Sequence, residues 1–174
     1  MMRLFFAIPL SDEIRNVLAQ YQDDLRNAGV TGNFSATENL HLTLAFIGEY
    51  PDPENVMDAV SGISFDSFRL EIQETGLFSD TLWAGILKND ALENLVRDLR
   101  RSLSDSGIPF DRKKFRPHIT LARKTLLHGK VSALPKPETS SMLVDSFSLF
   151  RSDRGKHGMI YTEIGQLCSE QPEQ

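Results

Sequence analysis

Apolar and polar residues alternate along the chain with two different periods, and the same order of periods occurs twice. An apolar run at positions 4–8 predicts a β-strand. Ser11 then begins a predicted helix, and Gly29 ends it. Apolar residues recur every three or four positions in this helix and predict its buried face: Ile14, Val17, Leu18, Tyr21 and Leu25.

The second half of the chain repeats this plan. Residues 82–87 predict a strand, and Asp90 with Glu93 is typical of a capping box at the start of a helix. Gly107 ends that helix. Its predicted buried stripe consists of Leu92, Leu95, Val96, Leu99 and Leu103.

A His-x-Thr strand follows each helix. His41-Leu42-Thr43-Leu44 recurs 77 residues later as His118-Ile119-Thr120-Leu121. Successive side chains of a strand point to opposite faces, so each copy places a His and a Thr on one face and two aliphatic residues on the other. If the two strands lie side by side, two imidazoles and two hydroxyls meet in one cleft.

Further elements continue the duplication. Asp52-Pro53 predicts the start of a short helix ending near Gly62, and a half-buried strand follows at 67–72. After the second motif, a weak helical stretch at 129–134 ends in a proline-rich break. One strand through Leu143, Phe147 and Leu149 and a last strand at 159–164 complete the pattern. We therefore expect two copies packed around a pseudo-two-fold axis.

Composition limits the class of protein. The 174 residues are 40% hydrophobic and 25% charged, which is ordinary for a soluble globular protein. The one cysteine, Cys168, leaves no intrachain disulfide or cysteine metal cluster, and fits a reducing cytoplasm. The apolar start is cut by Pro9, which argues against a signal peptide, and no run of 18 apolar residues predicts a membrane span.

Charge argues against a long nucleic-acid duplex as partner, because the net charge is −5. The segment 111–124 differs from the rest, since it carries six bases and one acid around the second motif. A small anionic ligand fits such a segment. The six bases are Arg112, Lys113, Lys114, Arg116, Arg123 and Lys124.

Paired histidines favour acid–base chemistry over a purely structural role. A single strand His beside a Thr is more often a polar pair on a half-exposed face. Two equivalent copies favour a shared wet site, because each unpaired buried polar group costs about 1–3 kcal/mol. One neutral imidazole can accept a proton while one imidazolium donates one, which suits in-line displacement at phosphorus. The residues themselves do not show which histidine is the acid.

Other chemistries find less support in the motifs. The chain has no His-Glu-x-x-His, no cysteine pair and no Gly-x-Ser-x-Gly elbow. It also lacks the glycine pattern that cradles a dinucleotide or triphosphate. We therefore expect neither a metal ion nor an organic cofactor.

The two motifs in their flanks resemble the two-histidine (2H) phosphoesterase superfamily, and within it the RNA 2′,3′-cyclic phosphodiesterases, also called 2′-5′ RNA ligases. The resemblance runs from Arg3-Leu4-Phe5-Phe6-Ala7-Ile8 through both motifs to the final strands. It implies an α+β fold with two pseudo-symmetric lobes. Each lobe is a mainly antiparallel sheet with helices outside, and a central cleft carries both motifs. We expect a single bilobal domain over 1–174, with a frayed tail at 166–174.

The resemblance also implies an activity and roles for residues. The activity is metal-independent hydrolysis of a terminal 2′,3′-cyclic phosphate on RNA or a cyclic nucleotide, leaving a 2′-phosphate, with ligation as the reverse reaction. His41 matches the proton donor to O3′ and His118 the proton acceptor that activates water. Thr43 and Thr120 match phosphate-binding threonines, and Arg123 matches an arginine at the phosphate. No membrane or obligate protein partner is expected.

Strand parity conflicts with one of these roles. Arg123 lies five residues after His118, so a regular strand would point the two side chains in opposite directions. Either the strand has ended or bulged by Ala122, or Arg123 curls around an edge. Arg116 has the right parity but precedes Pro117, which places it at the strand entrance. By the same parity, Phe46 is expected in the core; the alternative is an aromatic ring near the cleft that stacks on a base.

Other polar residues have two interpretations. His128 and His157 are expected on the surface, and the group Arg151, Arg154, Lys156 and His157 is either an RNA contact or a solvated turn. Two other functions stay open. One is hydrolysis of another nucleotide-derived cyclic phosphate or of a 2′-5′ oligonucleotide. The other is a non-catalytic module that binds RNA ends.

Overall fold

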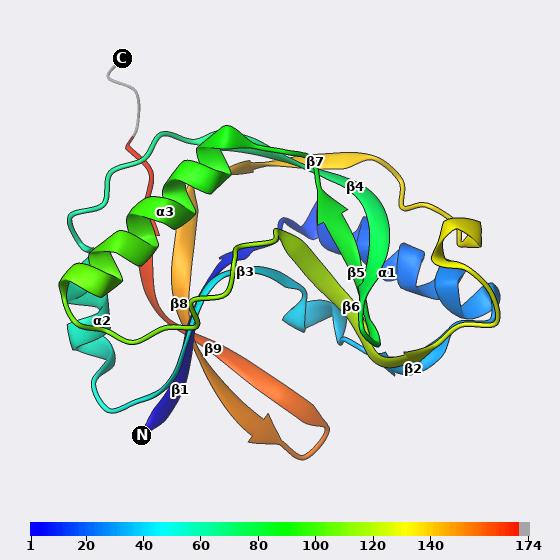
Figure 1. Cartoon of the computed structure of the whole chain (residues 1–174), viewed down its shortest axis with the longest axis horizontal. Coiled ribbons are helices and arrows are strands. Elements are labelled where there is room, and N and C mark those ends of the chain that lie inside the picture. The colour runs from blue at the N-terminus through cyan, green and yellow to red at the C-terminus, as the bar shows by residue number, and fades with distance from the viewer. Residues whose placement is uncertain (171–174) are drawn as a thin grey trace.

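The computed structural model describes residues 1–170 and consists of two antiparallel β-sheets with helices packed on them (Figure 1). The elements in chain order are β1 (Met2–Pro9), α1 (Asp12–Asn27), β2 (Thr31–Phe34), the 3₁₀ helix η1 (Thr37–Asn39), β3 (His41–Tyr50), α2 (Pro53–Val60), β4 (Phe68–Phe78), β5 (Thr81–Ile86), α3 (Asp90–Asp105), β6 (His118–Leu126), the 3₁₀ helix η2 (Val131–Ala133), β7 (Ser140–Val144), β8 (Ser146–Gly155) and β9 (Gly158–Cys168).

The sheets exchange strands between the two copies. The first sheet has the order β3-β1-β8-β9 and the second β2-β6-β5-β4-β7. Thus β4, from the first half of the chain, lies in the sheet of the second motif, whereas β8 and β9, from the second half, join the first sheet. The predicted α+β class with mainly antiparallel sheets is confirmed. The lobes, however, are not the two halves of the sequence.

The helices begin where side-chain caps satisfy their first backbone N–H groups. Ser11 Oγ accepts from the backbone N–H of Ile14 at 3.3 Å, as predicted, and Asp52 caps α2. The start of α3 differs from the prediction by one residue. Asn89 is its cap and accepts from Leu92 N at 3.0 Å, while Asp90 is the first helical residue. Asn89 holds the extended backbone that a cap requires.

The core lies between the helices and the inner faces of the sheets. All five residues of the predicted α3 stripe are buried, as are Ile14, Leu18, Tyr21 and Leu25 of α1. Val17 is only half-buried, and Gln22, which the pattern passed over, is 3% exposed. The aliphatic residues of both motifs are fully buried, which leaves their His and Thr on the opposite face.

Two predictions for the C-terminal part are wrong. The single strand expected through Leu143 and Leu149 is two strands, because the chain crosses at Asp145 from β7 in the second sheet to β8 in the first. Leu143 is consequently 52% exposed.

The second wrong prediction is the frayed tail at 166–174. Its first three residues end β9, where Gln166, Leu167 and Cys168 pair with Ser148, Phe147 and Ser146. Backbone pairing orders these three residues. Residues 171–174 lie outside the described part of the chain.

Candidate active site

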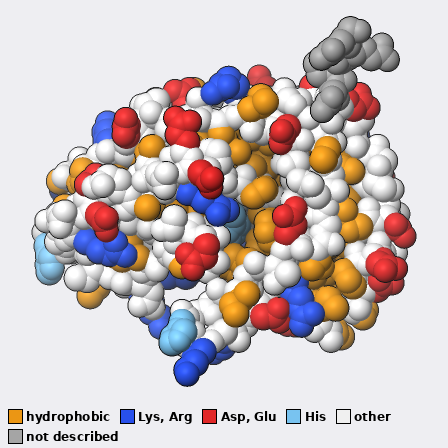
Figure 2. Space-filling view, turned by 180° about the vertical axis from the view of Figure 1, so that it is seen from behind, with side chains coloured by type: hydrophobic (Ala, Val, Ile, Leu, Met, Phe, Trp, Pro, Cys, Tyr) orange, Lys and Arg blue, Asp and Glu red, His pale blue; other side chains and the backbone are white. Residues whose placement is uncertain are grey.

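The two motif strands begin at the histidines themselves, and they contact each other between the sheets. His41 is the first residue of β3 and His118 the first of β6. The positive charges of Arg123 and His118 both act on the pKa of His41, so the structure brings these three side chains within electrostatic range. Figure 2 shows a histidine recessed beside basic side chains near the centre of one face.

Both imidazoles are held in the same way by a backbone carbonyl two residues earlier. His41 Nδ1 lies 2.6 Å from the carbonyl oxygen of Asn39, and His118 Nδ1 lies 2.6 Å from that of Arg116. A carbonyl oxygen only accepts, so Nδ1 carries the hydrogen in each ring. Nε2 is therefore the nitrogen that can exchange a proton with a substrate in both copies.

The surroundings of the two rings differ. His41 Nε2 is hydrogen-bonded to Thr43 Oγ1 at 2.9 Å, whereas His118 Nε2 has no such partner within residues 1–170. The His41 ring packs against Phe5 at 5.0 Å and the edge of Tyr161 at 5.2 Å between centroids. Aromatic rings thus cover part of the first histidine, which is half-buried.

An aromatic pair also lies beside the second histidine. Phe78 meets His118 edge-on with 5.0 Å between centroids, and Trp83 lies 5.0 Å behind Phe78. Trp83 pairs with Thr120 across β5 and β6. The hydroxyl of Thr120 therefore lies on the face that carries these rings and His118.

The pKa of His41 is lowered from its ordinary value. The largest cause is burial, which disfavours the charged imidazolium. The hydrogen bond to the Asn39 carbonyl acts in the opposite direction, and the nearby charges of Arg123, His118 and Arg15 lower the pKa further. In the free protein the neutral form of His41 is therefore favoured.

A β-bulge resolves the orientation of Arg123. Thr120 pairs with Trp83 and Ala122 with Leu82, so Leu121 is an extra residue in β6. Leu121 and Ala122 are both buried, and the alternation of faces shifts by one. Arg123, which is exposed, consequently lies on the face of His118 and Thr120. Of the arrangements expected for this strand, a bulge before Arg123 is the one that the structure contains.

An equivalent bulge in β3 overturns the expectation that Phe46 lies in the core. Leu44 is the extra residue in β3, between the pairs Ala45–Phe6 and Thr43–Ala7. Phe46 is half-buried, lies opposite Phe5 and has the guanidinium of Arg3 over its ring at 4.8 Å. It belongs to the face of His41, at the position that Arg123 occupies in the second copy.

The remaining basic residues lie at the periphery. Arg116 is exposed at the entrance of β6, with its guanidinium 5.8 Å from the centroid of the Phe78 ring. His128 and His157 are exposed, as expected. The hairpin of β8 and β9 projects from the body (Figure 1), and basic side chains with a histidine cover its tip (Figure 2). Arg112, Lys113 and Lys114 are exposed.

Several features of this region were missed from the sequence. The aromatic neighbours of the two histidines come from strands distant along the chain, and no local pattern places them there. They are Phe5, Tyr161, Phe78 and Trp83. The bulges did have a signal. Each motif continues into two consecutive small or aliphatic residues, Leu-Ala, where strict alternation requires only one.

No group of three His, Cys, Asp or Glu side chains is placed to hold a metal ion anywhere in residues 1–170. A pocket opens on the Asn39 side of His41, and Arg15, Phe150 and Tyr161 contribute to its lining. None of the helices described within residues 1–170 combines the length and the apolar character needed to cross a membrane.

Comparison with known proteins agrees with this arrangement. A family model described as LigT like Phosphoesterase matches residues 8–88 and again 84–161, one match for each copy. The RNA 2′,3′-cyclic phosphodiesterase of Escherichia coli K12 is 32% identical, with 93% of each chain covered. That of Thermotoga maritima is 30% identical, over 92% of this chain and 91% of its own.

A solved structure has the same fold. The crystal structure of E. coli LigT complexed with 3′-AMP matches with a TM-score of 0.83 and 30% identity, covering 98% of both chains. The resemblance found from the two His-x-Thr motifs is thus confirmed by the family model, the relatives and the fold. The chain belongs to the LigT-like phosphoesterase family.

Proposed function

We propose that this protein hydrolyses the terminal 2′,3′-cyclic phosphate of RNA to a 2′-phosphomonoester by acid–base catalysis, without a metal ion or cofactor. The observation that carries the proposal is the matched pair of imidazoles, each with Nδ1 held by a backbone carbonyl and Nε2 left for chemistry. The named activity of the E. coli and T. maritima relatives supports the substrate class.

In the proposed reaction, His118 Nε2 accepts a proton from a water molecule as the water oxygen bonds to phosphorus. The bond between phosphorus and O3′ breaks, and His41 Nε2 donates its proton to O3′. The products are a 2′-phosphate and a free 3′-hydroxyl. This assignment of acid and base follows the family resemblance; the near symmetry of the two histidines is broken by their surroundings.

Thr43, Thr120 and Arg123 bind the phosphate in this proposal. Arg123 supplies positive charge, and the threonine hydroxyls donate to the non-bridging oxygens. When His41 is protonated, its Nε2–H donates to Thr43 Oγ1, which frees the Thr43 hydroxyl hydrogen for the phosphate. The proposed proton donor, His41, and the proposed phosphate-binding residue Thr43 are thus hydrogen-bonded to each other.

His41 must carry a proton to act as donor, although its pKa is lowered in the free protein. The anionic substrate offsets this effect, because a negative charge near the ring favours the imidazolium and opposes the charge of Arg123. In the proposed cycle His41 is therefore protonated most readily with substrate bound. If a 5′-hydroxyl replaces water as the nucleophile, its oxygen bonds to phosphorus while O3′ leaves and takes the proton of His41. The product is then a 2′-5′ phosphodiester, which is the ligation reaction.

The test is hydrolysis of a 2′,3′-cyclic nucleotide and of an RNA oligonucleotide with a 2′,3′-cyclic end, in excess chelator. His41→Ala and His118→Ala should each lower kcat by about 10²–10⁴-fold. His128→Ala, which removes an exposed histidine, is the matched control and should leave kcat unchanged. Absence of turnover by the wild type would refute the enzyme proposal, and loss of turnover on chelation would refute the metal-free mechanism.

The choice of substrates separates the remaining functions. Faster turnover of a 2′-5′ dinucleotide or of another nucleotide-derived cyclic phosphate would favour that reaction of the same site. Tight binding of cyclic-ended RNA with no product would favour a module that binds RNA ends. The proposed place of work is the reducing cytoplasm, which is compatible with the free, exposed thiol of Cys168.

A further inference from the structure

At the bulge of each motif strand, a helix side chain donates a hydrogen bond to the carbonyl group of the bulged residue. In β6, the carbonyl oxygen of Leu121 accepts from Ser35 N at 2.9 Å and from Gln22 Nε2 at 3.0 Å. In β3, the carbonyl oxygen of Leu44 accepts from Arg100 Nε at 3.4 Å and Nη2 at 3.3 Å. At Leu121 the amide of Gln22 is a second donor beside the backbone N–H of Ser35, and at Leu44 the guanidinium of Arg100 is the donor.

Gln22 and Arg100 occupy equivalent places in the duplicated chain. Counted from Asp12 and Asp90, each is the eleventh residue of its helix. Each helix also reaches the motif strand of the other copy, since α1 bonds to β6 and α3 to β3. The same support therefore occurs twice, built from different side chains.

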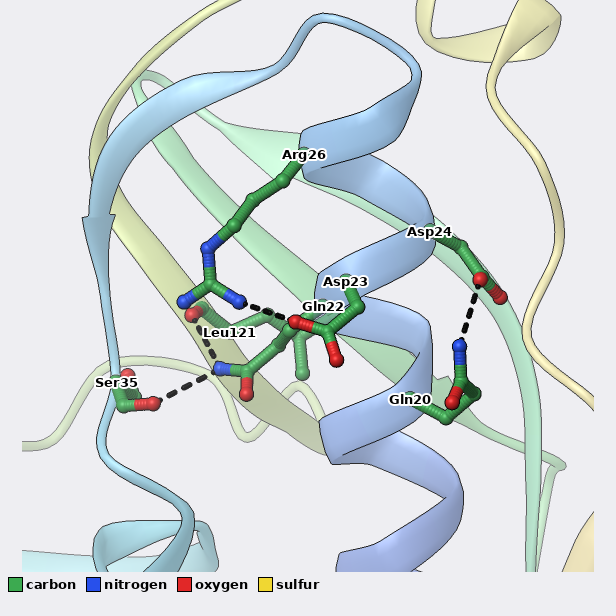
Figure 3. Close-up of polar contacts among 7 residues, drawn as sticks. All are labelled: Gln20, Gln22, Asp23, Asp24, Arg26, Ser35 and Leu121. Atoms are coloured by element: carbon green, nitrogen blue, oxygen red, sulfur yellow. Dashed lines mark hydrogen bonds and ion pairs between the residues drawn. The ribbon is translucent and has the colours of Figure 1, made fainter.

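Gln22 is specialised for this contact. It lies among the apolar residues of α1, is 3% exposed, and donates both of its Nε2 hydrogens. One goes to the carbonyl of Leu121 and the other to that of Ser35 at 2.9 Å (Figure 3). The amide thus joins β6 to the segment after β2 at the bulge itself.

We infer that Gln22 is a positioning residue: it stabilises the Leu121 bulge and so keeps Arg123 on the face of His118 and Thr120. The inference rests on the proposed role of Arg123 at the phosphate. Without the extra residue, the strand alternation would direct position 123 toward the side of Ile119 and Leu121, which are both fully buried. The guanidinium can approach an anion beside His118 only while the bulge persists.

The test combines Gln22→Met with Arg123→Ala in a double-mutant cycle. Met has a similar length but no donor for the Leu121 carbonyl. Gln22→Met alone should lower kcat/KM for a 2′,3′-cyclic nucleotide by about 10–100-fold, mainly through KM, because a small displacement of a positioned group is costly. In the Arg123→Ala background the same substitution should have no further effect, since the group that it positions is gone.

A matched control separates positioning from general loss of stability. Tyr21→Phe removes a partly buried hydrogen bond of α1, from the Tyr21 hydroxyl to the Pro135 carbonyl at 2.7 Å, and does not alter a residue that contacts the bulge. It should lower the melting temperature without raising KM. If Gln22→Met does not fold, Gln22→Asn withdraws the amide by one methylene and should show the same dependence on Arg123.

The outcomes are distinct. Three results would each overturn the inference. The losses of kcat/KM could multiply independently in the double mutant, a folded Gln22→Met could keep the wild-type KM, or Arg123→Ala could cause no loss of kcat/KM. Lack of turnover by the wild type would instead refute the proposed function. Loss of turnover that depends on Arg123, with Tyr21→Phe unaffected, supports the positioning role.

Discussion

His41 Nδ1 donates a hydrogen bond to the carbonyl oxygen of Asn39 across 2.6 Å. This contact selects the ring nitrogen that faces Thr43 as the one that titrates. The second copy uses the same offset of two residues, from His118 to Arg116. One local backbone geometry therefore orients both imidazoles, and burial and nearby charges lower the pKa of His41.

The titration of His41 is the most direct test of this site. We expect NMR of the labelled imidazole to give a pKa below 6.5 in the free protein, because burial and nearby cations disfavour the charged ring. Arg123→Met removes one of those cations and should raise the pKa of His41. Arg97→Met, on the exposed side of α3, is the control and should not change it. An unchanged pKa in Arg123→Met would show that Arg123 does not act on His41.

The pH dependence of kcat/KM tests which histidine is the acid. If His41 is the proton donor, activity on a 2′,3′-cyclic nucleotide requires its protonated form. Activity then falls as the pH rises through the lowered pKa of free His41, which sets the alkaline limb below about 6.5. Arg123→Met should move that limb to higher pH while lowering the maximum. Movement of the acidic limb instead would make His41 the base.

Gly76 should be intolerant of any side chain. A Cβ at this position would overlap the ring of Trp83, which packs on Phe78 and through it against His118. We expect Gly76→Ala to destabilise the fold by about 1–3 kcal/mol in urea unfolding and to lower kcat/KM as well. Adding Trp83→Leu should recover part of the stability.

The control for this change is Gly62→Ala, because a Cβ at Gly62 meets nothing within 4 Å. It should leave both stability and activity close to wild type. Equal losses in the two alanine variants would show that the close approach of Gly76 to Trp83 is not the cause.

The cap of α3 is testable by stability alone. Asn89→Ala should cost about 1 kcal/mol, because the backbone N–H of Leu92 loses its acceptor. Asp90→Ala should cost less, about 0.3–1 kcal/mol, since Asp90 contributes only its charge near the helix N-terminus. Urea denaturation of both variants gives the comparison. A larger loss for Asp90→Ala would restore the capping-box assignment that the structure moved by one residue.

The duplication, the apolar helix faces and the two His-x-Thr strands were predictable from the order of residues along the chain. These follow from local rules, because helix period, caps and strand alternation depend on residues close together in the chain. The buried stripe of α3 and the cap at Ser11 were predictable for that reason. The pairing of each His with a Thr on one face likewise needed only a period of two.

The orientation of Arg123 and Phe46 and the surroundings of the two histidines depend on tertiary structure. A bulge is defined by the partner strand, so strict alternation placed Arg123 and Phe46 on the wrong face until the registers with β5 and β1 were known. The exchange of β4 and β8 between sheets brought Phe78 and Phe150 to their places from opposite halves of the chain. The burial and neighbouring charges that lower the pKa of His41 depend on these long-range contacts, which no local pattern encodes.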